Sequence, residues 1–292
     1  MNQTKVIIEK EKRQKRNLLL FKILPKNIFS RIIGFFERLP LPLFILNKLI
    51  KVYIKAFNVK DEYIIPEKGF RSFDDFFTRE LIPGARKIDK DKNVIVSPVD
   101  ARIDQFGEID GSQLIQAKGM HYRLEELIPS DYAVHFVNGS FITMYLSPSD
   151  YHRIHSPVDG SINGYFLIPG TLFTVQEYMV RSLPNLFIHN ERVITYLESE
   201  HGLVALCKVG AFNVGRISLS YDDIISNKTF QWKKEKIYSQ ENKIMVHKGD
   251  ELGMFHLGST VILLFQKDKI TFSNVNTGKK VYLGEKIAVV NK

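Results

Sequence analysis

The sequence predicts an α+β protein that is mainly β, with a helical region at its N-terminus. From about residue 93 onward, short apolar runs alternate with turn residues, which is typical of strands. Before residue 60, apolar residues recur at helical spacing. A chain of 292 residues can bury a full core. We therefore expect a helical region over residues 1–60 and a β-sheet-rich body over residues 61–292.

The N-terminal region contains a charged leader, Lys5 to Arg16, followed by two amphipathic segments. Apolar residues at helical spacing predict a helix over Ile28 to Leu39 and a second over Leu43 to Phe57. The prolines between them separate the two helices. A third helix is expected over Phe70 to Leu81, where Ser72 can cap the first turn.

The body is expected to consist of strands joined by turns. One tetrapeptide, Ser-Pro-Val-Asp, occurs at residues 97–100 and again at 156–159, and it predicts two similar turns. The single cysteine, Cys207, excludes an internal disulfide, and its apolar surroundings predict a buried thiol in a strand. The expected strands cover residues 93–96, 102–107, 141–146, 162–167, 192–197, 203–209, 215–220, 260–265 and 286–290.

The positive charge is concentrated at the N-terminus. Residues 1–60 hold 14 Lys/Arg and 3 Glu, a balance of +11, whereas the rest holds 27 basic and 29 acidic residues, a balance of −2. Basic residues opposite large apolar faces suit an anionic membrane surface. The alternative, that the helices pack on the body and expose their lysines to water, stays open. Bulky aliphatics interleave the basic residues, so we expect no nucleic-acid partner. No apolar run is long enough to predict a membrane-spanning helix.

The stretch richest in reactive side chains runs from Tyr145 to Gly160. His152 and His155 lie there between prolines, which favours a loop or turn, and histidine suits proton transfer near neutral pH. Surface or capping histidines are the alternative. No nearby Cys, His or Glu cluster completes a metal site around His-x-x-His, so we expect no metal.

Two further features bear on chemistry. Asp100 and Asp159 each follow Ser-Pro-Val; either can orient a histidine or serve only as a turn residue, and spacing does not choose between them. Gly258-Ser259 precedes an apolar run that reads as a buried strand. An activated Ser259 hydroxyl can attack the unhindered Gly258 carbonyl. A turn glycine followed by a strand-edge serine is the alternative.

Several short motifs resemble those of the phosphatidylserine decarboxylase proenzymes of the bacterial and mitochondrial membrane type, and they occur in the same order along the chain as in that family. The histidine motif and the Leu-Gly-Ser-Thr motif are the specific ones, and Ala101 departs from the family, which usually has Gly after the Asp. The motifs are Phe73-Asp-Asp-Phe-Phe-Thr-Arg79, Pro83-Gly-Ala-Arg86, Ser97-Pro-Val-Asp100, Ser149-Asp-Tyr-His-Arg-Ile-His155-Ser-Pro-Val-Asp-Gly160, Pro169-Gly-Thr-Leu-Phe173, Asn190-Glu-Arg192, Val209-Gly-Ala-Phe-Asn-Val-Gly215 and Phe255-His-Leu-Gly-Ser-Thr260.

The resemblance implies a self-processing enzyme. Ser259 would attack the Gly258 carbonyl, with His155 as general base and Asp100 orienting it. β-Elimination from the resulting ester would separate a β chain, residues 1–258, from an α chain, residues 259–292, and leave a pyruvoyl group derived from Ser259. That group would be the electron sink for decarboxylation, with His152 protonating the α-carbon.

The resemblance also implies the partners. Phosphatidylserine would be converted to phosphatidylethanolamine and CO2 in phospholipid biosynthesis, with no metal. The β and α chains would stay associated, and a homodimer stays open. The basic helical region over residues 1–60 would hold the protein peripherally on an anionic membrane, at the cytoplasmic face of the cell membrane in a bacterium.

Three other functions compete with this expectation. A serine hydrolase would use Ser259, His155 and Asp100 without self-cleavage, although the chain has no Gly-x-Ser-x-Gly elbow. An inactive homologue would bind lipid and release no CO2. A pyruvoyl decarboxylase acting on a soluble amino acid would have no need of a basic amphipathic N-terminus.

Overall fold

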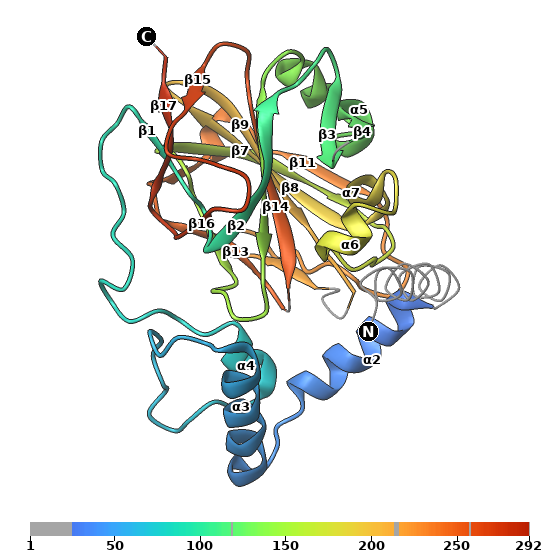
Figure 1. Cartoon of the computed structure of the whole chain (residues 1–292), viewed down its shortest axis with the longest axis vertical. Helices are drawn as coiled ribbons and strands as arrows, with labels where there is room; N and C mark the ends of the chain where they lie inside the picture. The colour runs from blue at the N-terminus through green and yellow to red at the C-terminus, as the bar shows by residue number, and fades with distance from the viewer. Residues whose placement is uncertain (1–24, 118, 213–215, 257, 292) are drawn as a thin grey trace, which may run out of the picture.

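The computed structural model describes residues 25–117, 119–212, 216–256 and 258–291 (Figure 1). The charged leader therefore lies outside the described residues. The helices are α2 Lys26–Arg38, α3 Leu43–Phe57, α4 Phe73–Phe77, α5 Leu124–Leu127, α6 Glu177–Val180 and α7 Leu186–His189, with 3-10 helices η1 Asp131–Phe136 and η2 Gln240–Asn242.

Strands dominate the body. They are β1 Val94–Val96, β2 Ala101–Glu108, β3 Gln113–Ala117, β4 Met120–Arg123, β5 Ser140–Leu146, β6 Arg153–His155, β7 Gly160–Ile168, β8 Arg192–Ser199, β9 Gly202–Val209, β10 Ile217–Leu219, β11 Lys234–Ile237, β12 Ile244–Val246, β13 Glu251–Phe255, β14 Ser259–Phe265, β15 Ile270–Phe272, β16 Lys280–Val281 and β17 Lys286–Val290. The predicted mainly β, α+β class is confirmed. Each of the nine predicted strands overlaps one of these, although the strand expected over residues 215–220 covers only Ile217–Leu219 and residue 215 lies outside the described residues.

The main sheet is antiparallel in the order β11-β7-β8-β9-β14-β5-β2-β16, with β12 also pairing with β7. Smaller sheets, β1-β17-β15, β10-β13-β6 and the two-stranded β3-β4, accompany it. Strand β14 is central, because it pairs with β5 along one edge and with β9 along the other. Its seven residues are all buried, which agrees with the apolar run in the sequence.

The two Ser-Pro-Val-Asp segments form the predicted pair of similar turns. Ser97 Oγ donates to Val99 O at 2.6 Å, and Ser156 Oγ donates to Val158 O at 2.7 Å. Each aspartate then accepts a backbone N–H, that of Leu283 at Asp100 and that of Lys248 at Asp159. The turns also contact each other, since Val96 N donates to Pro157 O and His155 N to Pro98 O. This pairing brings two distant segments of the sequence together at one end of the main sheet.

The predicted helix over Ile28 to Leu39 and the one over Leu43 to Phe57 are confirmed as α2 and α3. The prediction of a helix over Phe70 to Leu81 is wrong in length, because α4 ends at Phe77. Beyond α4 the chain becomes extended and pairs with the segment around Tyr63, which Leu81 meets in a β-bridge. The capping prediction is confirmed: Asp75 N donates to Ser72 Oγ at 3.1 Å.

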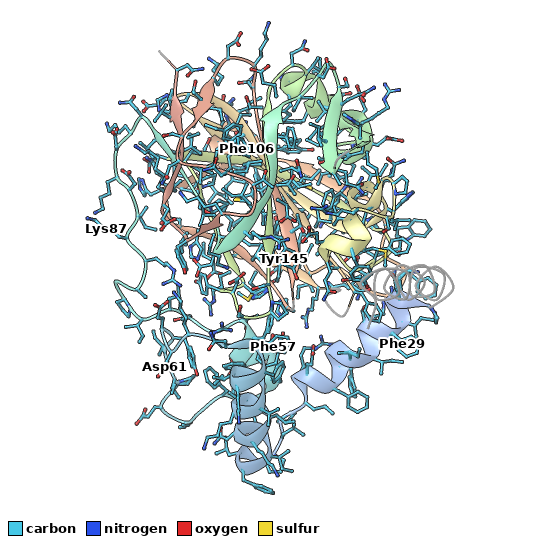
Figure 2. All side chains as sticks on the ribbon, in the orientation of Figure 1. Phe29, Phe57, Asp61, Lys87, Phe106 and Tyr145 are labelled. Atoms are coloured by element: carbon cyan, nitrogen blue, oxygen red, sulfur yellow. The ribbon has the colours of Figure 1, made fainter. Side chains whose placement is uncertain are left out.

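The helices α2, α3 and α4 lie together outside the β body (Figure 1). They contain a separate small core in which Leu46 and Ile50 of α3 join Phe76 of α4. Figure 2 shows Phe29 and Phe57 on this helical part, away from the β body that holds Phe106. Cys207 is buried in β9 as predicted. Among the described residues, no helix combines the length and apolar character needed to span a bilayer.

Candidate active site

Ser259 is the first residue of β14, opposite Leu146 of β5. Its side chain is fully buried, and its hydroxyl has no hydrogen-bond partner within the described parts of the chain. A buried hydroxyl without a partner is uncommon, because burial removes water without replacing its hydrogen bonds. The central strand thus holds the Ser259 hydroxyl in a fixed position directly after Gly258.

His152 is the imidazole that the structure places beside Gly258. A Cβ built on Gly258 would lie 4.0 Å from His152 Nε2. His152 Nδ1 donates to Asp150 O at 2.8 Å, which leaves Nε2 unprotonated in the neutral ring and without a hydrogen-bond partner among the described residues. Burial, with a contribution from the Arg79 charge, lowers the pKa of His152 to about 3. The ring is therefore neutral near pH 7 and presents a lone pair close to the Gly258–Ser259 bond.

His155 lies in a different environment. Its Nδ1 donates to Gly249 O at 2.7 Å, so its Nε2 accepts from the hydroxyl of Tyr151 at 3.0 Å. Burial lowers the pKa of His155, although the backbone hydrogen bond to Gly249 acts in the opposite direction. Both ring nitrogens are thus occupied, and no hydrogen bond joins His155 to Ser259 in the described residues.

Asp100 is buried and bound by Arg86 rather than by a histidine. Arg86 Nη2 lies 2.6 Å from Asp100 Oδ2, its Nε lies 3.0 Å from Oδ1, and a second carboxylate, Glu62, lies 2.8 Å from Nη1. The charge of Asp100 still reaches His155, where it favours the protonated ring. The carboxylate is close enough to influence His155, but the two side chains share no hydrogen bond in the described structure.

The environments of Asp100 and Asp159 differ, although their turns are alike. Asp100 is 3% exposed, whereas the Asp159 side chain is 50% exposed and lies 3.4 Å from Nδ1 of the exposed His247. Burial with a specific charge partner is typical of functional carboxylates. The structure thus favours Asp100 over Asp159 where sequence spacing could not choose.

We predict that Asp100→Asn lowers stability and slows self-processing, whereas Asp159→Asn changes neither. Removing the carboxylate charge leaves the largely buried Arg86 without its main partner, which should cost about 2 to 4 kcal/mol. Thermal unfolding and the fraction of cleaved chain are the measurements. Asp159 occupies the matching position in the second turn, so its asparagine variant is the control. Equal effects at the two positions would mean that both aspartates serve only their turns.

Sequence reasoning did not assign roles to three residues around these groups. Tyr151 binds His155, Arg86 binds Asp100, and Arg79 donates to the carbonyls of Ser149 and Asp150, next to His152. Arg79 and Arg86 lie within motifs that carry the family resemblance, and Tyr151 lies inside the histidine motif. Their presence in those motifs could have indicated that they matter to the site. The sequence could not show which residues Arg79 and Arg86 bind, because those partners are distant along the chain.

The motif Asn190-Glu191-Arg192 organises the surroundings of the site. Asn190 Nδ2 donates to Phe173 O and to Gly210 O, both at 2.8 Å. Glu191 accepts from Ser226 Oγ at 2.5 Å, while Arg192 Nε donates to Leu127 O at 2.8 Å. These buried polar side chains tie separate loops to the start of β8, which fixes the loops relative to the main sheet.

A basic cavity of about 360 Å³ lies between α2, Asp74 of α4, His256 and the segment over residues 225–228. His256 is part of its wall, and His256 Nδ1 lies 2.8 Å from Asp74 Oδ1. Burial lowers the pKa of Arg216, and the nearby positive charge of Arg38 lowers it further. Among the described residues, no carboxylate forms an ion pair with either arginine. The lining is Ser30, Arg31, Gly34, Glu37, Arg38, Asp74, Arg216, Ile225, Ser226, Asn227, Lys228 and His256.

The family model described as phosphatidylserine decarboxylase matches residues 73–289, which include all four candidate site residues. The chain belongs to the phosphatidylserine decarboxylase family. It is 40% identical over 274 residues to the phosphatidylserine decarboxylase proenzyme of Myxococcus xanthus, covering 93% of this chain and 97% of the relative. The proenzymes of Saccharophagus degradans and Aliivibrio salmonicida are 38% and 39% identical, over 93% and 92% of this chain and 96% of each relative.

Membership of this family agrees with the resemblance drawn from the motifs. The matched region begins at Phe73 and therefore excludes α2 and α3, whereas the alignments with the whole relatives cover more than nine-tenths of the chain. Within the described residues, no group of three or more His, Cys, Asp or Glu side chains is arranged to hold a metal ion.

Proposed function

We propose that this member of the phosphatidylserine decarboxylase family cleaves itself at Gly258–Ser259 and converts phosphatidylserine to phosphatidylethanolamine and CO2 with a pyruvoyl group. The observation that carries the proposal is the buried Ser259 hydroxyl, which has no hydrogen-bond partner among the described residues, next to Gly258 and the equally unpartnered Nε2 of His152. Two neighbouring groups with unsatisfied hydrogen-bonding capacity are expected where a reaction is prepared.

Self-cleavage needs the serine hydroxyl and a base. Ser259 Oγ attacks the Gly258 carbonyl, and the peptide C–N bond breaks as an ester C–O bond forms. Loss of the Ser259 α-proton then breaks the Oγ–Cβ bond and releases the Gly258 carboxylate. Tautomerisation of the new N-terminal residue and addition of water release ammonia. Every step uses atoms of the chain and one water molecule, so neither an oxidant nor a metal is required.

His155 is the proposed base for this cleavage, with Asp100 favouring its protonated form. The contact between the two Ser-Pro-Val-Asp turns supports the pairing, as does the effect of the Asp100 charge on the His155 pKa. Tyr151 donates to His155 Nε2, so a proton from Ser259 reaches His155 through the Tyr151 hydroxyl or after that hydroxyl moves away. Tyr151 is therefore proposed as a positioning residue.

The residues around position 259 fit a pyruvoyl group. The Ser259 hydroxyl that would be converted has no partner to lose within the described residues, and His152 presents an unprotonated nitrogen close by. When formed, the pyruvoyl group supplies an electron sink for decarboxylation, which side chains lack. His152 is proposed to transfer the proton to the substrate α-carbon, and its neutral ring at pH 7 has to receive that proton first.

The two chains are proposed to stay together after cleavage. Strand β14 belongs to the C-terminal fragment, yet its hydrogen-bonding partners β5 and β9 both belong to the N-terminal fragment. All seven β14 residues are buried between these neighbours. Cutting the bond before Ser259 leaves the pairs from Thr260 to Phe265 on both sides of β14, so these hydrogen bonds and the buried side chains hold the fragments together.

Attachment to an anionic membrane is supported by the orientation of α2. Its buried residues are polar, Lys26 and Ser30, while its large apolar side chains face outward. This is the reverse of a helix that packs its apolar face on a core. Helix α3 does bury Leu46 and Ile50, but much of its apolar surface is exposed too. The exposed side chains are Ile28, Phe29, Ile32, Phe35 and Phe36 on α2 and Leu43, Phe44, Ile45, Leu49, Val52 and Phe57 on α3.

The basic cavity beside His256 is proposed to bind the phosphodiester of the lipid headgroup. Arg38 and Arg216 repel each other, so an anion between them would relieve the repulsion. Of the two acids in the wall, Asp74 is bound to His256, and burial raises the pKa of Glu37 to about 8, which leaves it mostly uncharged at pH 7. The cavity therefore carries a net positive charge.

We predict that Arg216→Gln raises KM for phosphatidylserine by at least about 10-fold and leaves the extent of self-cleavage unchanged, because it removes a charge-assisted contact with the headgroup. Steady-state CO2 release from vesicles measures KM. Arg181→Gln, an exposed arginine on another part of the surface, is the control. An unchanged KM would mean that the cavity does not bind the headgroup.

The test of the proposed function is a paired measurement on the purified protein with vesicles. Intact mass should show two chains that separate at Gly258–Ser259, and phosphatidylserine labelled at its carboxyl group should release CO2. A single chain of 33.8 kDa that releases no CO2 would refute the proposal. A serine hydrolase that uses Ser259 predicts one intact chain, so the intact-mass measurement discriminates between the two functions. CO2 release from free serine, measured beside release from vesicles, tests whether the enzyme acts on a soluble amino acid instead of the lipid.

A further inference from the structure

The loop between β10 and β11 exposes two aromatic side chains that nothing in the mechanism uses. Phe230 is 88% exposed, and Trp232, the single tryptophan of the chain, is 80% exposed. Soluble proteins seldom leave large neighbouring aromatics in water, because each exposes apolar surface that association would bury. We refer to residues Lys228–Lys234 as the aromatic loop.

The exposure does not come from an unanchored loop. At its base, the buried carboxylate of Glu191 accepts from Ser226 Oγ at 2.5 Å and from Asn227 N at 2.9 Å. Within the loop, Lys228 N donates to Gln231 Oε1 at 2.9 Å, and the Gln231 amide donates back to the preceding backbone at 3.1 Å. Hydrogen bonds on both sides of Phe230 thus hold the aromatic loop in a defined shape with its rings outward.

The backbone at Phe230 is strained. Its φ of 55° lies in the left-handed region, which bulky residues without a short polar side chain rarely adopt. Neither Phe230 nor Trp232 stacks on another ring among the described residues. The strained backbone at Phe230 holds an exposed ring in place without an aromatic partner inside the described parts of the chain. Such strain is expected where the side chain contacts a partner outside the chain.

The surroundings of the aromatic loop identify that contact. Arg31 of α2 donates to Asn227 Oδ1 at 3.1 Å and to Lys228 O at 3.1 Å, which joins the loop to the helix with outward apolar residues. Lys228, Lys233 and Lys234 flank the two rings, and the loop itself contains no acidic residue. Aromatic rings bordered by lysines suit the interface of an anionic bilayer, where rings enter the acyl boundary and ammonium groups meet phosphates.

We propose that the aromatic loop is a second membrane contact, in which Phe230 and Trp232 insert into an anionic bilayer next to α2. The proposal rests on the proposed action on a membrane lipid. Together, α2 and the aromatic loop would place two rims of the basic cavity at the headgroup level, because Arg31 and Lys228 line that cavity. A lipid headgroup would then reach the cavity without leaving the bilayer.

Trp232 provides the test, since its emission is the only tryptophan signal of the protein. The full-length protein is titrated with vesicles of phosphatidylcholine and phosphatidylglycerol in a 7:3 ratio. We expect a blue shift of the emission, protection from acrylamide, and quenching by lipids brominated on their acyl chains. Phe230→Ser should weaken vesicle binding by at least about 5-fold, because it removes a buried aromatic. Val134→Ser, which changes a residue 68% exposed on η1, is the control and should bind as the unmodified protein does.

Three outcomes would overturn the proposal. One is co-sedimentation with vesicles without any change in Trp232 emission, which would assign binding to the helices alone. Another is equal binding by Phe230→Ser and the unmodified protein. The third is equal binding to vesicles of phosphatidylcholine alone, which would remove the role of the lysines.

Failure of the proposed function is distinguishable from these outcomes. Phe230→Ser should still cleave at Gly258–Ser259 and should release CO2 from a soluble short-chain phosphatidylserine at the unmodified rate. An unmodified protein that neither cleaves nor releases CO2 would refute the decarboxylase function, whereas the Trp232 shift reports membrane insertion independently of catalysis.

Discussion

Ser259→Ala is expected to yield a single uncut chain and to lose decarboxylation by at least about 10⁴-fold, because the hydroxyl is both the nucleophile of cleavage and the source of the pyruvoyl group. Intact mass on a denaturing column should give one species near the 33.8 kDa of the whole chain. Unmodified protein should give two, the smaller one beginning with a pyruvoyl group. CO2 release from phosphatidylserine vesicles is the activity measurement.

The fold should survive this substitution. Ser259 Oγ forms no hydrogen bond within the described residues, so its removal breaks none of those contacts and leaves only a small space in the core. The melting temperature of Ser259→Ala should therefore stay close to that of the unmodified protein before cleavage. Ser182→Ala, which alters an exposed hydroxyl bonded to Tyr178 O, is the control and should cleave fully. Cleavage of Ser259→Ala at residue 258 would show that the chain is cut by another route.

His155→Gln and His152→Gln are expected to have separate effects. If His155 is the base for cleavage, His155→Gln should remain one chain. His152→Gln should cleave and then release CO2 at least about 10²-fold more slowly, since general acid–base catalysis contributes that much or more. The two histidines are three residues apart and both buried, so each variant is the matched control of the other. Intact mass and CO2 release together separate the two roles.

The described geometry makes this comparison decisive. His152 Nε2 has no partner among the described residues and faces Gly258, whereas His155 Nε2 is held by Tyr151. If His152→Gln blocks cleavage and His155→Gln does not, the base is His152 and the proposed assignment is reversed. Tyr151→Phe tests the hydrogen bond between Tyr151 and His155. If His155 is the base, loss of the Tyr151 hydroxyl should change the pH dependence of the cleavage rate as well as its magnitude.

Much of the architecture was predictable, because it depends on local pattern. Helix α3 was predicted with its observed bounds, and β14 was recognised from an uninterrupted apolar run. The repeated Ser-Pro-Val-Asp segments were predicted as similar turns, because proline and the hydroxyl of serine favour one backbone shape. The strands missed were short, exposed or interrupted; β11, for example, is exposed throughout and is a strand only because β7 pairs with it.

The sequence by itself also determined which residues are candidates for the chemistry, since the motifs around His152, His155 and Ser259 contain the residue types that the proposed reaction requires. Only the tertiary structure decided how these groups are partnered. It paired Asp100 with Arg86, placed His152 rather than His155 beside Gly258, and turned the apolar side of α2 outward. Helical periodicity shows that α2 has two faces but not which one meets the body. That choice, like each of these contacts, depends on segments brought together from distant parts of the chain, and local pattern holds no information about them.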